Sequence, residues 1–166
     1  MAVVACLCII GIQHTALGNN KQYMLGTNVN PHDVCPGGKF RFHSYKKEAF
    51  FGDTGAGGIV CGPVEAGAME TFEVDDTLKG EFLKGPHDNK YCSQNPGHFV
   101  ACTHGYSDSE LTADYAPFAL IQSSEDPDRY AMRFGSSGYC SSVDKDVLKC
   151  ESSWFDLWES FRVDCA

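Results

Sequence analysis

The sequence predicts an all-β protein of the β-trefoil class, in which three four-stranded repeats are arranged about a pseudo-threefold axis. Three observations predict this fold. Short apolar runs alternate with clusters of Gly, Asn, Asp and Ser, as expected for many short strands joined by turns. No stretch has the periodicity of a long amphipathic helix. Finally, three sequence anchors recur in the same order along the chain, which indicates an internal repeat.

The repeat is defined by the spacing of these anchors. The first anchor is a hydrophobic pair followed by a small or polar residue, and the second is a Cys ten positions after the middle of the first. The third is a large residue, two spacers, a Phe, one spacer and an aliphatic residue. In chain order the three copies lie at residues 50–52, 91–93 and 139–141 for the first anchor, at Cys61, Cys102 and Cys150 for the second, and at residues 69–74, 115–120 and 158–163 for the third.

An apolar strand precedes each first anchor, so each copy should hold four strands and three copies twelve, between about Lys39 and Cys165. One copy alone has open edges and cannot bury its apolar face, whereas three copies can share one core and pair their edges as in a barrel. We therefore expect one domain over residues 39–166. Its repeats should span about 39–76, 77–126 and 127–165, and its equivalent buried sites should hold Phe72, Phe118 and Phe161.

The residues before the first repeat divide into two parts. The apolar run 2–12 is too short to span a bilayer, but its length fits the central region of a signal peptide. Small residues at Ala16 and Gly18 fit a cleavage site, so residues 1–18 are a candidate signal peptide. No Lys or Arg precedes the run, and the alternative interpretation is a buried strand. Residues 19–38 form an N-terminal extension.

The charge of the chain restricts its partners. A formal net charge of -9 over 166 residues argues against nucleic acid and an anionic membrane as partners, because both require a basic surface, although net charge does not exclude a local basic patch. We therefore expect neither a nucleic-acid partner nor membrane insertion. The adjacent carboxylates Asp75–Asp76 and Glu125–Asp126 fall at expected turns between repeats, and we interpret them as turn formers rather than as an acid/base pair.

The nine Cys of the chain include no C-x-x-C pair, so we expect no zinc site of that spacing and no cofactor. Two repeats carry matching cysteines that flank a short hairpin, and in an oxidising compartment we expect a disulfide across each hairpin. In the first repeat Phe51 occupies the position of the first Cys, which leaves Cys61 as a thiol. The two predicted hairpin bridges are Cys92–Cys102 and Cys140–Cys150.

A third disulfide is expected from the closure of the barrel. The first strand (about 39–43) and the last (about 161–165) should pair, because leaving either open would expose an unpaired edge. In an antiparallel pair the start of one strand lies beside the end of the other, which makes Cys35 and Cys165 neighbours. The alternative for all these cysteines is that they are buried thiols.

The second repeat has a longer loop than its siblings, and this loop is the candidate ligand site. Its second and third anchors are sixteen residues apart, against eleven in the other two copies. Loops that lengthen on a rigid scaffold often carry function, although a tolerated surface insertion is the alternative. Aromatic rings can stack on a sugar while carboxylates accept its hydroxyl hydrogens. The candidate ligand-binding residues are Tyr106, Asp108, Glu110, Asp114 and Tyr115.

The last repeat resembles the fascin-like β-trefoil family. Residues 138–141 are similar to its Tyr-Leu-Ser-like strand end, residues 147–150 to its Gly-x-Val-x-Cys-like strand, and residues 158–163 to its Trp-Glu-x-Phe-x-Val-like strand. The resemblance covers about residues 39–165 and rests on core positions. It implies the trefoil fold and an actin-associated function in the cytosol. Actin-bundling members of that family use several such domains in tandem, whereas this chain has one.

The function that the sequence predicts is that of a non-enzymatic binding module. The chain has no G-x-S-x-G motif and no phosphate-binding loop, so we expect neither catalysis nor a nucleotide. By analogy with other trefoils, we expect a secreted protein whose partner is a carbohydrate, although the ricin-type Gln-x-Trp signature is absent. The alternatives are a cytosolic, fascin-like actin-binding protein and a protease-inhibitor-like or structural protein with a protein partner. The sequence leaves the oligomeric state open.

Overall fold

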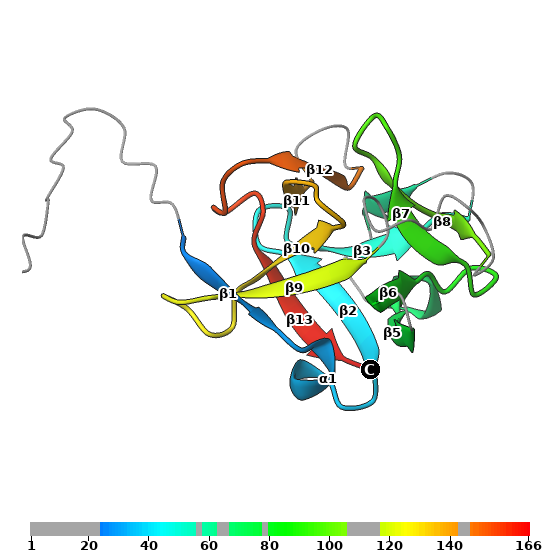
Figure 1. The fold of residues 1–166 in the computed structure, drawn as a ribbon, viewed down its shortest axis with the longest axis horizontal. Coiled ribbons are helices and arrows are strands. Elements are labelled where there is room, and N and C mark those ends of the chain that lie inside the picture. Colours follow the sequence, from blue (N-terminus) through cyan, green and yellow to red (C-terminus); the bar gives the residue numbers. More distant parts are fainter. Residues whose placement is uncertain (1–23, 56–57, 63–66, 78–79, 106–116, 143–146) are drawn as a thin grey trace, which may run out of the picture.

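The strands follow one another in three sets of four, preceded by one additional strand (Figure 1). The computed structural model describes residues 24–55, 58–62, 67–77, 80–105, 117–142 and 147–166. The first repeat contains β2 (Lys39–Ser44), β3 (Ala49–Asp53), β4 (Ile59–Cys61) and β5 (Phe72–Thr77). The second contains β6 (Gly80–Lys84), β7 (Tyr91–Gln94), β8 (Val100–His104) and β9 (Phe118–Ser123). The third contains β10 (Tyr130–Phe134), β11 (Tyr139–Ser141), β12 (Lys149–Ser152) and β13 (Phe161–Cys165).

The first and fourth strands of each repeat form a closed barrel. Antiparallel ladders join β5 to β6, β9 to β10 and β13 to β2, and the last of these closes the barrel along five residue pairs from Phe161↔Ser44 to Cys165↔Phe40. Shorter contacts complete the circle, including a single bridge between Phe82 of β6 and Pro117 just before β9. The predicted pairing of the first and last trefoil strands is therefore confirmed.

The second and third strands of each repeat form three hairpins that cap one end of the barrel. The hairpins are joined to one another by backbone hydrogen bonds, from the Val100 amide to the Leu148 carbonyl (3.0 Å) and from the Leu148 amide to the Ile59 carbonyl (2.8 Å). These three residues each stand two positions before a second-anchor Cys, and each is at most 1% exposed. Their side chains occupy equivalent positions in the three repeats and fill the core at this end of the barrel. The whole arrangement is that of a β-trefoil.

The Phe residues of the third anchor lie in the core, as predicted. Phe72, Phe118 and Phe161 are the first residues of β5, β9 and β13, and their exposed fractions are 0%, 3% and 0%. All three belong to one apolar cluster. Because burying a large aromatic side chain is strongly favourable, membership in this cluster explains why the Phe recurs.

From the sequence, all the anchor residues are expected to be core positions, but the large residue that opens the third anchor is not fully buried in the first and third repeats. Met69 is 38% exposed and Trp158 is half-buried. Met69 lies in the 3-10 helix η1 (Ala68–Glu70), and this turn buries Glu70 instead, whose carboxylate accepts a hydrogen bond from the Gly67 amide (2.7 Å). The Glu70 side chain, which caps the turn, therefore faces the interior, and the Met69 side chain faces solvent.

The described cysteines pair as the sequence predicts. The structure contains the two hairpin disulfides Cys92–Cys102 and Cys140–Cys150. The disulfide Cys35–Cys165 joins the residue that follows α1 (Pro31–Val34), four positions before β2, to the last residue of β13. In the first repeat the cross-strand partner of Cys61 is Phe51, so Cys61 keeps its thiol, which donates to the Ala49 carbonyl (3.5 Å).

The N-terminal extension contributes a strand that the sequence did not predict. β1 (Gly26–Val29) pairs antiparallel with β9, and the short helix α1 (Pro31–Val34) follows it. Among the residues that the structure describes, the one β-bridge between β6 and this segment is at Pro117, just before β9, which leaves the edge of β9 open to β1. The candidate signal peptide lies outside the described residues. Among the residues that the structure describes, no helix is long and apolar enough to cross a membrane.

Candidate binding site

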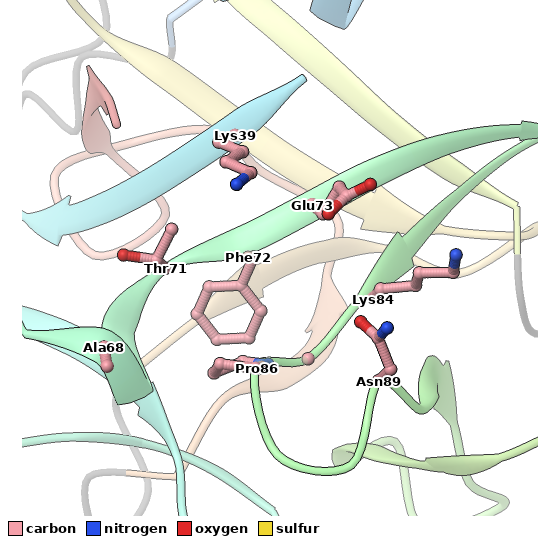
Figure 2. A pocket seen from close by; sticks show the side chains of 9 residues that line it. Lys39, Ala68, Thr71, Phe72, Glu73, Lys84, Pro86 and Asn89 are labelled. Atoms are coloured by element: carbon pink, nitrogen blue, oxygen red, sulfur yellow. The ribbon is translucent and has the colours of Figure 1, made fainter. Parts of the chain in front are cut away.

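An open pocket of about 330 Å³ lies where the first repeat meets the second. It is bordered by the start of β2, by β5 and the turn before it, and by the end of β6 with the turn that follows (Figure 2). Figure 2 shows the labelled side chains around the Phe72 ring, with Lys39 on one side and Pro86 and Asn89 on the other. The Phe72 ring is 0% exposed, so it is the floor of the pocket and not a contact surface.

Strand register brings the charged residues of the pocket together. Lys39 of β2 is the cross-strand partner of Glu73 on β5, and Glu73 is in turn the partner of Lys84 on β6. Directly opposed residues point to the same face of a sheet. A Lys–Glu–Lys row therefore crosses three strands on one face, although its members are far apart in the sequence.

The β6 end of this row is held by a hydrogen-bonded cluster. The Tyr91 hydroxyl donates to Asp75 Oδ2 (2.5 Å), and Lys84 Nζ lies 3.0 Å from the same oxygen and 5.1 Å above the Tyr91 ring. The Tyr91 hydrogen bond, followed by that of Lys84, lowers the pKa of Asp75. The hydrogen bond that Lys84 donates to Asp75 raises the pKa of Lys84. Asp75 is thus charged and neutralises Lys84 at neutral pH.

This cluster corrects the interpretation of Asp75 and Asp76 as turn formers. Both residues lie within β5, and Asp75 is opposite Phe82 in the β5–β6 ladder. A carboxylate is tolerated at this strand position because Tyr91 and Lys84 satisfy it.

The remaining polar groups of the pocket differ in how readily they could form a hydrogen bond with a ligand. The Thr71 hydroxyl already donates to the Gly67 carbonyl (3.1 Å) and accepts from Arg41 Nε (3.0 Å). Lys39, Glu73 and Asn89 are exposed. They offer an ammonium donor, a carboxylate acceptor and an amide that does both. The pocket thus combines balanced charge with donors and acceptors, and Pro86 and Ala68 add apolar surface.

The candidate ligand residues Tyr106, Asp108, Glu110, Asp114 and Tyr115 lie outside the described residues, so their role stays a prediction. The pocket was missed from the sequence because no motif marks it. Its residues come from three separate segments, and only the register of β2, β5 and β6 assembles them. Among the described residues, no group of three or more His, Cys, Asp or Glu side chains could hold a metal ion.

Comparison with known proteins finds similarity in structure but not in sequence. No protein-family model matches it, and no curated protein sequence matches it. Among solved structures, it is similar to the Macrolepiota procera ricin B-like lectin in complex with lactose, with a TM-score of 0.59 and 10% identity over 78% of this chain and 96% of that one. It is also similar to the designed 3-fold symmetric protein ThreeFoil, with a TM-score of 0.60 and 10% identity over 78% of this chain and 99% of that one.

These likenesses confirm the β-trefoil fold that the repeat predicts. At 10% identity they show the fold alone. Neither a lectin family nor a fascin-like family follows from them, and the fascin-like resemblance stays a sequence-based prediction.

Proposed function

We propose that the protein is a secreted, non-enzymatic module that binds carbohydrate, and that the pocket between the first and second repeats is its binding site. The observation that carries this proposal is the chemistry of the pocket. Lys39, Glu73 and Asn89 offer donors and acceptors beside apolar surface, which suits the alternating hydroxyls and C–H faces of a sugar ring. Asp75 pairs with Lys84, and Glu73 lies opposite Lys39, so the charges around the pocket are balanced and favour a neutral sugar over a strongly anionic ligand.

Two further observations support the proposal. The chain spans 96% of a solved ricin B-like lectin whose structure contains lactose. The three disulfides agree with an oxidising, extracellular environment, because such bonds are rare in the cytosol. The loop residues Tyr106 and Tyr115 are the second place where this module would contact a glycan.

The proposal is tested by screening the purified protein on an array of neutral and acidic glycans, followed by titration calorimetry with the best neutral ligand. Replacing Glu73 with Gln should weaken binding about tenfold, since a hydrogen bond to a charged group contributes about 1.5–3 kcal/mol. Asn89→Ala should have a comparable effect. The matched control is Glu48→Gln, which changes an exposed carboxylate in the turn at the opposite end of β2 and should leave the affinity unchanged.

The other outcomes separate the alternatives. Loss of binding in Tyr106→Ala and Tyr115→Ala, with Glu73→Gln unaffected, would move the site to the long loop. Failure to bind any glycan would contradict the carbohydrate proposal. Cosedimentation with filamentous actin would then test the function that the fascin-like resemblance of residues 138–163 implies.

A further inference from the structure

Among the residues that the structure describes, β1 is the end strand of its sheet and pairs with β9 on one side (Figure 1). The Ser124 amide donates to the Leu25 carbonyl (2.8 Å), and these two residues are opposite each other when the β1–β9 register is extended by one pair. In an antiparallel ladder, such hydrogen-bonded pairs alternate with pairs whose backbone groups point outward. The N–H and C=O groups of Gly26 and Asn28 are therefore directed away from β9, toward the outer edge of the sheet.

The residue that precedes β1 by two positions follows the same alternation. The Met24 amide donates to the Phe155 carbonyl (2.8 Å), which belongs to the loop between β12 and β13 and not to β9. This loop covers the outer side of the chain at Met24. At Gly26 and Asn28 the same outer side has no partner strand within the described part of the chain.

Exposed apolar side chains gather at this edge. The structure describes four large hydrophobic residues that are exposed, and Met69 is the one of them that lies elsewhere. Leu25, immediately before β1, is 75% exposed. Trp154 and Leu157 are 53% and 48% exposed, and they lie in the loop that accepts the hydrogen bond of Met24. Exposed apolar residues that lie together mark a surface for interaction with another molecule.

The distribution of charge favours a second copy of this chain as the partner. No Asp, Glu, Lys or Arg occurs between Lys21 and Asp33, although the whole chain has a net charge of -9. Two copies therefore repel each other over much of their surface but can approach at this uncharged edge. Edge strands that stay single usually carry a charged side chain or a Pro that blocks pairing, and β1 has neither.

We propose that β1 pairs antiparallel with β1 of a second copy, so that the sheets of the two molecules become continuous across a twofold axis. The register follows from the alternation along the outer edge. With Gly26 of one copy opposite Asn28 of the other, both residues exchange backbone hydrogen bonds across the axis. The same register places Leu25 opposite Val29 of the second copy, and Thr27 opposite its own equivalent, which are favourable cross-strand pairs.

This interface goes beyond carbohydrate binding and does not depend on it, because β1 contributes no residue to the pocket described above. The two pockets of such a dimer would belong to one particle.

Sedimentation velocity of the full chain over a range of concentrations tests the proposal. We expect a reversible equilibrium between monomer and dimer. Leu25→Lys should weaken dimerisation about tenfold or more, because the charge of one copy would lie opposite the apolar Val29 of the other. Met69→Lys is the matched control, since it makes the same change at an exposed hydrophobic residue outside this edge, and it should leave the dimer unchanged.

Asn28→Pro tests the backbone pairing itself. It removes an N–H that points away from β9 and should also weaken the dimer about tenfold, because one hydrogen bond is lost from each copy. Hydrogen exchange checks that β1 stays in place, since the Thr27 and Val29 amides, which face β9, should keep their protection in this variant. In the unsubstituted protein the Gly26 and Asn28 amides should be protected at high concentration and should exchange faster on dilution.

A chain that stays monomeric up to about 100 μM contradicts the proposal. A dimer that survives both Leu25→Lys and Asn28→Pro contradicts it as well, because the two molecules would then associate through another surface. Exchange of the Gly26 and Asn28 amides that does not change with protein concentration leads to the same conclusion.

Discussion

At the scale of single residues, the fold depends on side chains that recur at equivalent places in the three repeats. Phe72, Phe118 and Phe161 begin their strands and meet in one core. Where a repeat departs from the pattern, the departure is compensated locally. Phe51 fills the place of a cysteine and packs edge-on against the Phe161 ring, with centroids 5.2 Å apart.

Truncating Phe118 to Ala should lower the free energy of unfolding by about 3–5 kcal/mol, because it removes a buried ring and leaves a cavity in the shared core. Met69→Ala is the matched control from the same sequence anchor, and its exposed side chain should cost less than about 1 kcal/mol. Urea denaturation followed by circular dichroism measures both. Equal losses in the two variants would contradict the assignment of Phe118 to a threefold core site.

The sequence predicted the residues of the core better than those of the candidate site. The Phe and Cys positions follow from spacing within a repeat, which a one-dimensional pattern contains. The pocket instead depends on the register between β2, β5 and β6, which places Lys39, Glu73 and Lys84 in one row. Asp75 was misinterpreted for a related reason, since its partners Lys84 and Tyr91 lie on the two strands that follow.

At the scale of elements, β1 is the strand that the sequence did not indicate. Three of its four residues are exposed and the fourth is partly buried, so it shows no alternation of apolar and polar side chains. Its position is determined by the backbone ladder with β9 and by the packing of Phe155 near Gly26. A strand that is held mainly by backbone hydrogen bonds leaves no hydrophobic period from which it could be predicted.

Replacing Gly26 with Val should displace β1 from β9. A Cβ at this position would overlap the Ile121 side chain and approach the Gln122 carbonyl (3.0 Å) and the Phe155 ring (3.3 Å). Overpacking of this kind costs about 1–3 kcal/mol. Hydrogen exchange should show faster exchange in β1 and at its contacts on β9, while the β5–β6 ladder stays protected. Thr27→Val is the control, because the Thr27 side chain is exposed. Unchanged protection of β1 in the Gly26 variant would refute this account.

At the scale of the whole molecule, one covalent bond secures the closure of the barrel. The Cys35–Cys165 disulfide spans 130 residues, whereas each hairpin disulfide spans 10. In the chain-entropy description, longer loops confer more stability, about 5 kcal/mol for the closure bond against about 3 kcal/mol for a hairpin bond.

Removing the closure bond by the double substitution Cys35→Ala and Cys165→Ala should therefore destabilise the protein more than Cys140→Ala with Cys150→Ala. The comparison is made from guanidinium denaturation midpoints under non-reducing conditions, with Cys61→Ala as the control that breaks no disulfide. The reverse order of stabilities would show that packing around the hairpin bridge outweighs the entropy of the closed loop.

The pairing of β2 with β13 also determines when the protein can fold during its synthesis. β2 cannot pair with β13 until β13 has been synthesised. Each hairpin disulfide can form as soon as its own ten-residue loop is complete. At about 5–20 residues per second, the ribosome needs about 7–26 s to pass from Cys35 to Cys165. For that time Cys35 is without its native partner, while Cys61 and the two pairs of hairpin cysteines are synthesised in turn. A wrong bond formed in this interval would have to be reshuffled before the barrel could close, so the yield of native protein should depend on a thiol–disulfide exchange catalyst.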